Sequence, residues 1–339
     1  MNLSRYVRIF CRNRGHQLIR QKTGSRTMST TVLVDNIGTI SLIGLNRPEK
    51  RNAVDPPTAE ILYRAFKDFE QDENRTVAIL YGKGGHFCGG YDLKALSRVD
   101  KDILPSAVDP VDSDIGPMGP TRIAFTKPVI AAVSGYAVAG GMELSMMCDL
   151  RVLEESAKMG IFCRRFGVPL TDGGTVRLPR LVGLSRALDL ILTGREIGAR
   201  EAYEFGLANR VVPDGTSLDV AIELAETLSR FPQKCMNADR ASAYYGMYDA
   251  KSRIDALQNE FTQGNKLTAE EAIPGMDDLL YIIVHHTLFR NACLHEKQPH
   301  LSKLVTLIYT RSNVGDGLLE LVSINCQYIK FIHGEIRSK

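Results

Sequence analysis

Apolar residues recur along this chain with two different spacings, and the two alternate. Short runs rich in β-branched residues predict strands at 31–35, 39–45, 77–81, 129–133 and 150–153. Apolar positions three and four residues apart predict helices at 58–70, 142–148, 184–193, 199–205, 218–231 and 234–246. The first two strands are separated by Asn36-Ile37-Gly38, a hairpin signal. Strands that alternate with helices predict an α/β fold.

Two glycine-rich turns each follow a predicted strand. The first is Phe87-Cys88-Gly89-Gly90-Tyr91-Asp92-Leu93, and the second runs from Ser134 through Gly140-Gly141 to Glu143. Glycines let backbone N–H groups approach a ligand closely, and the start of a helix favours negative charge. Each turn can donate one peptide N–H to the same oxygen. We therefore predict an oxyanion hole, with the Glu143 carboxyl group one helical turn away.

These turns belong to a longer series of motifs, which resembles the crotonase family, also called the enoyl-CoA hydratase/isomerase superfamily. The series also includes 46–53, 148–149, 173–180, 192–194 and 202–212, and its order and spacing agree over about residues 30–272. The resemblance implies a spiral of repeated ββα units followed by a helical C-terminal region that builds trimers. We expect a spiral core at 30–225 and a helical region at 226–275.

The resemblance also assigns roles to individual residues. It places the two oxyanion donors at the peptide nitrogens of Tyr91 and Gly140, and the acid/base group at Glu143. Next to Leu144, Met146 and Met147, this carboxyl group is expected to be partly desolvated, which raises its pKa. The alternative is a carboxylate that only stabilises the helix N-terminus.

The resemblance places the coenzyme A part of the substrate along two segments. It points to the backbone of Arg51 and Ala53 near the adenine, and to Asp92, Leu93 and Lys94 after the first turn. As cations, Lys94 or Arg47 can meet the phosphates, although each is more commonly a solvated surface charge. Because coenzyme A is part of the substrate, we expect neither a separate cofactor nor a metal.

One position departs from the family pattern. Hydratases of this family hold a second glutamate where this chain has Cys163. Arg164 and Arg165 can lower the pKa of the thiol, but a small buried apolar residue is the favoured interpretation. Asp172 is the nearby acid that can replace the missing carboxyl group. It also suits a turn before two glycines, so both roles stay open.

Composition narrows the class of protein. The 339 residues are 44% hydrophobic and 24% charged, typical of a globular protein with a sizeable core. No apolar stretch reaches the roughly 18 residues of a membrane-spanning helix. The seven cysteines include no Cys-x-x-Cys pair, so reduced thiols inside a cell are expected. Nothing in the charge pattern indicates a nucleic-acid partner.

The N-terminal segment carries a charge bias. Seven Lys and Arg residues precede the first acid, Asp35, and without them the net charge of +3 becomes 3 − 7 = −4. An Arg-rich, acid-free leader predicts a mitochondrial transit peptide at 1–28 and a matrix location. The alternatives are a nonspecific basic tail, or initiation at Met28, which would give a cytosolic or peroxisomal form. The last three residues, Arg337-Ser338-Lys339, are not a peroxisomal address.

The sequence changes character after about residue 273. Apolar, β-like runs at 279–284 and 304–309 do not match the helix-rich ending of the family. We interpret residues 276–339 as an atypical tail of poor order.

The resemblance to the crotonase family implies an acyl-CoA-processing enzyme, and in particular an enoyl-CoA hydratase. Water would add to a 2-enoyl-CoA through an enolate of the thioester, stabilised by the oxyanion hole. One alternative is an enoyl-CoA isomerase or another CoA-thioester enzyme, since Cys163 replaces the second glutamate. Another is a noncatalytic acyl-CoA-binding protein. The expected partners are an acyl-CoA substrate and further copies of the chain, as a homotrimer or a dimer of trimers.

Overall fold

The computed structural model describes residues 30–98 and 113–268. The chain divides into two compact units, with the boundary after Gln233, and each is considered by itself below. The predicted leader at 1–28 and the tail at 276–339 lie outside the described residues.

The first unit is built on a six-stranded sheet in the order β1-β2-β3-β4-β6-β9. The strands are β1 (Val32–Ile37), β2 (Ile40–Leu45), β3 (Val77–Gly82), β4 (Val129–Val133), β6 (Leu150–Glu154) and β9 (Arg210–Val212). β1 and β2 form the antiparallel hairpin that Asn36-Ile37-Gly38 predicted, and all other neighbours are parallel. Parallel strands need helical crossovers, so the α/β prediction is confirmed.

Alternate residues of these strands face two different cores. Ile79 and Ile130 face one side, where α7 (Ser217–Ser229) packs through Ala221 and Ala225. Leu80 and neighbouring residues face the other side, where α1 (Pro56–Gln71) packs. Asp55 caps the N-terminus of α1 by accepting a hydrogen bond from the Thr58 amide at 3.1 Å. The domain boundary expected at 225 falls inside α7, which belongs with the sheet.

A second, three-stranded sheet positions the central helix of the unit. It consists of β5 (Tyr136–Val138), β7 (Lys158–Gly160) and β8 (Glu196–Gly198). β5 leads directly into α3 (Gly140–Met147), in which every residue is buried. Glu143 is the only charged residue of α3, so its carboxyl group lies in an apolar helix surrounded by protein.

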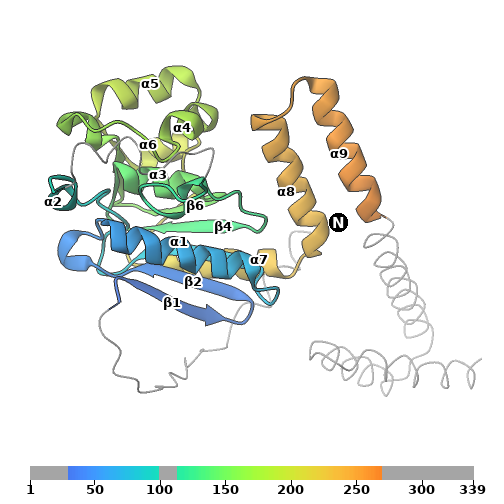
Figure 1. The fold of residues 1–339 in the computed structure, drawn as a ribbon, viewed down its shortest axis with the longest axis horizontal. Coiled ribbons are helices and arrows are strands. Elements are labelled where there is room, and N and C mark those ends of the chain that lie inside the picture. The colour runs from blue at the N-terminus through green and yellow to red at the C-terminus, as the bar shows by residue number, and fades with distance from the viewer. Residues whose placement is uncertain (1–29, 99–112, 269–339) are drawn as a thin grey trace, which may run out of the picture. The chain divides into compact units, whose positions relative to one another are not determined.

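Of the remaining elements of the first unit, α4 and η4 pack against α3. Figure 1 shows α3, α4, α5 and α6 gathered beyond one side of the six-stranded sheet. Their bounds are α4 (Gly174–Val182), α5 (Leu184–Thr193) and α6 (Ala199–Glu204), with the short α2 (Leu93–Leu96) after the first glycine-rich turn. The described residues of the unit also contain the 3-10 turns η2 (Pro48–Lys50), η4 (Pro120–Arg122) and η5 (Phe162–Phe166).

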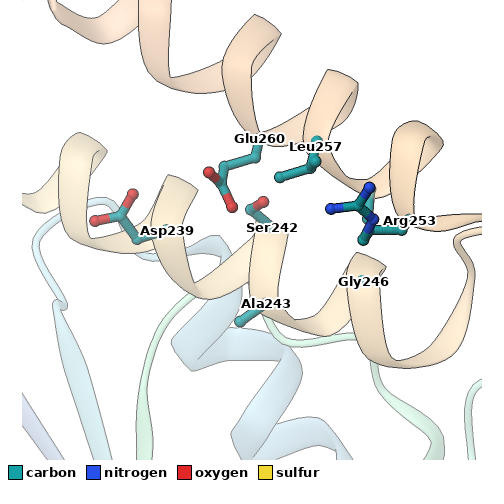
Figure 2. Close-up of a pocket in the computed structure, with 8 residues that line it drawn as sticks. Asp239, Ser242, Ala243, Gly246, Arg253, Leu257 and Glu260 are labelled. Atoms are coloured by element: carbon teal, nitrogen blue, oxygen red, sulfur yellow. The ribbon is translucent and has the colours of Figure 1, made fainter.

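The second unit, as far as the structure describes it, contains α8 (Gln233–Tyr248) and α9 (Arg253–Leu267). Neither helix has a buried residue. A pocket of about 380 Å³ lies between them, and Figure 2 shows Ser242 of α8 and Glu260 of α9 pointing toward each other there. It contains none of the predicted site residues. No helix in the described part of the chain is long and apolar enough to cross a membrane.

Candidate active site

The two glycine-rich turns contact each other in the first unit. Gly90 has φ +93°, and a Cβ atom placed on it would lie 2.9 Å from Ala139 Cβ and 3.3 Å from the Gly140 nitrogen. Only glycine allows so close an approach at such a φ value. The structure therefore brings Tyr91 and Gly140, the two predicted donors, to the same place.

Backbone pairing fixes the direction of the Tyr91 N–H group. Val54 donates to the Gly90 carbonyl and accepts from the Asp92 amide, both at 2.8 Å. Because successive N–H groups of an extended chain point to opposite sides, the Tyr91 N–H points away from Val54. It donates to no group within the described residues.

The Gly140 N–H is the first of α3, and no intrahelical acceptor exists for it. The preceding residue, Ala139, has φ +52° and ψ −127°, a conformation that L-residues rarely adopt. Its amide is held by the Gly160 carbonyl at 2.8 Å. The β5–α3 turn thus keeps a strained backbone that directs the helix N-terminus, as is common at functional sites.

Glu143 lies in the first turn of α3 and is 3% exposed. Its Oε1 accepts hydrogen bonds from the backbone amides of Gly174 at 2.8 Å and Asp172 at 3.0 Å. Burial and the nearby Asp172 carboxyl group raise the pKa of Glu143 to about 7, although the two amides and Arg177 act in the opposite direction. Such a group can both accept and donate a proton near neutral pH.

Asp172 is also 3% exposed, in the loop before α4. Its Oδ1 accepts from the Thr121 hydroxyl group at 2.5 Å and from the Met118 amide at 3.0 Å. Burial raises the pKa of Asp172, while these donors and Arg122 and Arg177 partly offset the effect. The structure therefore contains two neighbouring buried carboxyl groups, although the family's second glutamate is absent.

Cys163 lies in η5 and is buried. Burial and the Glu143 carboxyl group raise the pKa of the thiol, and Arg164 does not overcome them. Arg164 does lower the pKa of the thiol, but its effect is smaller than that of burial and Glu143. The Arg165 guanidinium group stacks on Phe162, with 3.9 Å from Cζ to the ring centroid, and donates to the Gly194 carbonyl. A neutral thiol at this place fits the small buried residue that we favoured.

The expectation that Arg47 meets a phosphate is wrong. Its guanidinium group is buried and pairs with Asp55 at 2.7 Å and Asp92 at 3.1 Å, and it donates to the Ala53 carbonyl. Asp92 also pairs with Lys50 at 3.1 Å and caps α2. These carboxylates already neutralise Arg47, so this cluster holds the first glycine-rich turn together.

The other predicted coenzyme A contacts stay predictions. Leu93 and Lys94 are exposed beside the first turn. The backbone groups of Arg51 and Ala53 are all hydrogen-bonded within the protein, so a ligand there would use the second lone pair of a carbonyl oxygen. The Arg51 side chain lies over the Tyr136 ring, with 5.6 Å from Cζ to the ring centroid.

Four residues of the site were missed in the sequence. Asn52 is fully buried in a left-handed conformation, and its amide group donates to the Lys83 and His86 carbonyls. Asparagine adopts the left-handed conformation more readily than most residues, so an asparagine in the 46–53 motif could have indicated a tight turn there. The others are Met118 and Thr121, which contact the Asp172 carboxyl group from a distant part of the chain, and Arg177, which lies five residues after Asp172 and donates to its carbonyl.

The arrangement suits one kind of chemistry. The Tyr91 and Gly140 N–H groups lie on two contacting turns, and Glu143, whose pKa is nearly neutral, follows in the same helix. A carbonyl oxygen that accepted from both groups could gain charge while a proton moves nearby. Within the described residues, no three His, Cys, Asp or Glu side chains are grouped as a metal site.

Comparison with known proteins agrees with this fold. The family model described as enoyl-CoA hydratase/isomerase matches residues 35–272. The enoyl-CoA hydratase EchA19 of Mycobacterium tuberculosis is 41% identical over 205 residues, which cover 58% of this chain and 74% of the relative. A carnitinyl-CoA dehydratase of Salmonella paratyphi A is 36% identical over 59% of this chain and 75% of its own length.

Solved structures give the same result. An enoyl-CoA hydratase from Bacillus anthracis aligns with a TM-score of 0.68 and 30% identity, over 74% of this chain and 96% of the other. The first unit and its paired turns therefore define an acyl-CoA enzyme of the crotonase fold. The chain belongs to the enoyl-CoA hydratase/isomerase family. Its relatives support an enzyme of hydratase type rather than a noncatalytic binding protein.

Proposed function

We propose that this protein hydrates a 2-enoyl-CoA thioester. The observation that carries the proposal is the buried Glu143 carboxyl group, with a pKa of about 7, three residues after the Gly140 amide. The relatives named as enoyl-CoA hydratases support the same reaction.

In this mechanism, the Tyr91 and Gly140 amides bind the thioester oxygen. A carboxylate takes a proton from water, whose oxygen bonds to C3 of the substrate, and the electron pair of the double bond moves toward the thioester as an enolate. A proton then returns to C2, so one water molecule is added in total. Each amide donor contributes about 3 kcal/mol in comparable oxyanion sites.

Glu143 and Asp172 share the two proton transfers in this proposal. The direct support is that both are buried, that burial raises the pKa of both, and that the charge of Asp172 acts on Glu143. Neighbouring carboxyl groups of this kind tend to hold one proton between them, as an acid and a base. Cys163, with its raised thiol pKa, takes no proton in this scheme.

A second candidate is isomerisation of a 3-enoyl-CoA. Cys163 stands where hydratases of the family hold a glutamate, and moving a double bond needs only one group that removes and returns a proton. Purified protein should be assayed with crotonyl-CoA and with a 3-enoyl-CoA, with products identified by mass spectrometry. Hydroxyacyl-CoA from crotonyl-CoA supports the proposal, and conversion of the 3-enoyl substrate alone supports isomerisation.

We also propose that the chain assembles into trimers and acts in fatty acid metabolism, as the family resemblance implies. Exposed apolar side chains on α5, at Leu184, Leu188 and Leu192, lie four residues apart and so form one stripe. Sedimentation analysis of Leu192→Glu tests this, with Val34→Glu on the exposed β1 as the control. If Leu192→Glu still forms the trimer, the leucine stripe of α5 is not part of the subunit interface.

The location of the protein is a separate proposal. The bacterial relatives fit the alternative, in which the protein starts at Met28, better than the mitochondrial expectation. Fusing residues 1–27 to a fluorescent protein tests both. Mitochondrial fluorescence supports the transit peptide, and diffuse cytosolic fluorescence supports the alternative.

A further inference from the structure

The Arg177 side chain bridges two chain segments that meet at the carboxyl pair. It extends from the first turns of α4, and its Nη1 donates to the Asp172 carbonyl at 2.9 Å. Its Nη2 donates to the Thr121 carbonyl at 2.6 Å. Gly173, with φ +89°, has no room for a Cβ atom because the guanidinium group lies against it. One planar cation therefore connects the loop before α4 to the η4 turn.

The same two segments are joined through the Asp172 carboxyl group. The Thr121 hydroxyl group and the Met118 amide both donate to Oδ1, and Arg122 donates to the Thr171 carbonyl at 3.3 Å. The first two bonds orient the carboxyl group, whereas Arg122 and Arg177 hold the main chain of the loop, Arg122 at Thr171 and Arg177 at Asp172. Removing Arg177 therefore loosens the backbone at the residue from which the carboxyl group projects.

Glu143 depends on the same loop. Its Oε1 is held by the amides of Asp172 and Gly174, which flank the residue that packs on the guanidinium group. A shift of this loop moves both amides away from Glu143. Arg177 thus acts on Glu143 through the loop, without a hydrogen bond to its carboxyl group.

We propose that Arg177 is a positioning residue, whose guanidinium group clamps the Asp172 loop to the η4 turn and so holds Asp172 and Glu143 in their working arrangement. The proposed consequence for catalysis rests on the hydratase function above. The clamp itself does not, because it consists of bonds within the protein.

The charges around the pair give the direction of a pH effect. Arg177 from α4 and Arg122 from η4 lower the pKa of Asp172, and Arg177 also lowers that of Glu143. Facing them are the Cys163 thiol from η5 and the Tyr91 phenol, both with raised pKa values. Loss of Arg177 removes a cation and adds none, so proton loss from the pair should need a higher pH.

Two variants and one control test the clamp. Arg177→Met removes the charge and the donors, and Arg177→Lys keeps the charge. Arg180→Met is the matched control, since Arg180 is an exposed arginine of the same helix and donates to the Val176 carbonyl within it. Each protein is measured by hydrogen–deuterium exchange over residues 170–176, and by the pH profile of crotonyl-CoA hydration.

We expect at least tenfold faster exchange of the Asp172 and Gly174 amides in Arg177→Met, with Arg180→Met like the wild type. Activity should fall at least tenfold, and the basic limb of the profile should move to higher pH. Compared with Arg177→Met, Arg177→Lys should return the basic limb toward its wild-type pH because it keeps the charge, but it should restore less of the rate. Unchanged exchange in Arg177→Met overturns the clamp, whether or not the wild type hydrates crotonyl-CoA. If the wild type does not hydrate crotonyl-CoA but Arg177→Met still exchanges faster than the wild type, the clamp is upheld and the hydratase function is rejected.

Discussion

The backbone amide of Asp172 donates a hydrogen bond to Oε1 of Glu143, over 3.0 Å. One acidic residue therefore helps to hold the other, by its main chain, while its own carboxyl group is held by Thr121 and Met118. The amide stabilises the charged form of Glu143, and the nearby Asp172 charge opposes it. Substitutions that change one group while preserving the other's contacts can separate these effects.

Glu143→Gln should abolish most of the hydration activity. The amide oxygen of glutamine can still accept from the two backbone donors, but the side chain no longer transfers a proton. We expect turnover of crotonyl-CoA to fall by about 10²-fold or more, with little change in the affinity for butyryl-CoA measured by calorimetry. Glu155→Gln, at an exposed glutamate, is the control. Activity within a few-fold of the wild type would rule out Glu143 as the acid/base.

The same variant should change how stability depends on pH. The pKa of Glu143 rises from 4.5 to about 7 on folding, so the native state binds the proton more tightly than the unfolded state does. Stability from this group is fully present below pH 4.5 and is lost as the pH rises toward 7. The difference corresponds to about 3 kcal/mol. Urea unfolding at several pH values should show Glu143→Gln gaining stability relative to the wild type between pH 4.5 and 8; a constant difference would contradict the raised pKa.

Asp172→Asn and Cys163→Glu test which residue supplies the second carboxyl group. If Asp172 has this role, Asp172→Asn should lower hydration by at least tenfold, because asparagine keeps an acceptor for Thr121 but exchanges no proton. Cys163→Glu would then add a third carboxyl group beside Glu143 and depress activity. The opposite pattern, a roughly tenfold gain from Cys163→Glu and no loss from Asp172→Asn, would show that the position of the family's second glutamate was limiting. If neither variant alters the rate, Glu143 works without a second carboxyl group.

Gly90→Ala should destroy the oxyanion hole. Its Cβ atom would lie 2.9 Å from that of Ala139 and 3.0 Å from the Val138 carbonyl oxygen, so the two turns must separate. We expect a loss of at least 10²-fold in kcat for crotonyl-CoA, which is the scale for removing one oxyanion donor. Gly85→Ala is a matched control, because Gly85 has nearly the same φ, +89°, but no atom within 4 Å of the added Cβ. Equal losses in both variants would assign the effect to backbone strain alone.

Regular elements with a strong local pattern could be predicted from the sequence. The strand at 129–133 and the helix at 184–193 have the bounds that the structure gives β4 and α5, because both show an unbroken apolar pattern over their whole length. The second sheet was missed, since its strands β5, β7 and β8 have three residues each. Three residues show too little alternation to indicate a strand, and only their partners in the fold define them.

The site divides in the same way. The glycine-rich turns indicated where Tyr91 and Gly140 come together, because tight turns leave a local signal. Arg47 was assigned to the surface, although its partner Asp92, 45 residues away, holds it in the interior. Thr121 bonds Asp172 across 51 residues, and Arg177 bonds the Thr121 carbonyl across 56 residues, and no spacing in the sequence reveals such contacts.

The two proposed oxyanion donors, the Tyr91 and Gly140 amides, are backbone groups, held in place by the Val54 pairing and by the Ala139 turn. Substituting Tyr91 leaves its peptide N–H in the chain, so this part of the site can persist while neighbouring side chains diverge. Descendants of such a scaffold can exchange one thioester reaction for another by gaining or losing a carboxyl group at a position such as Cys163 or Asp172. Selection can then explore new reactions without rebuilding the group that activates the substrate.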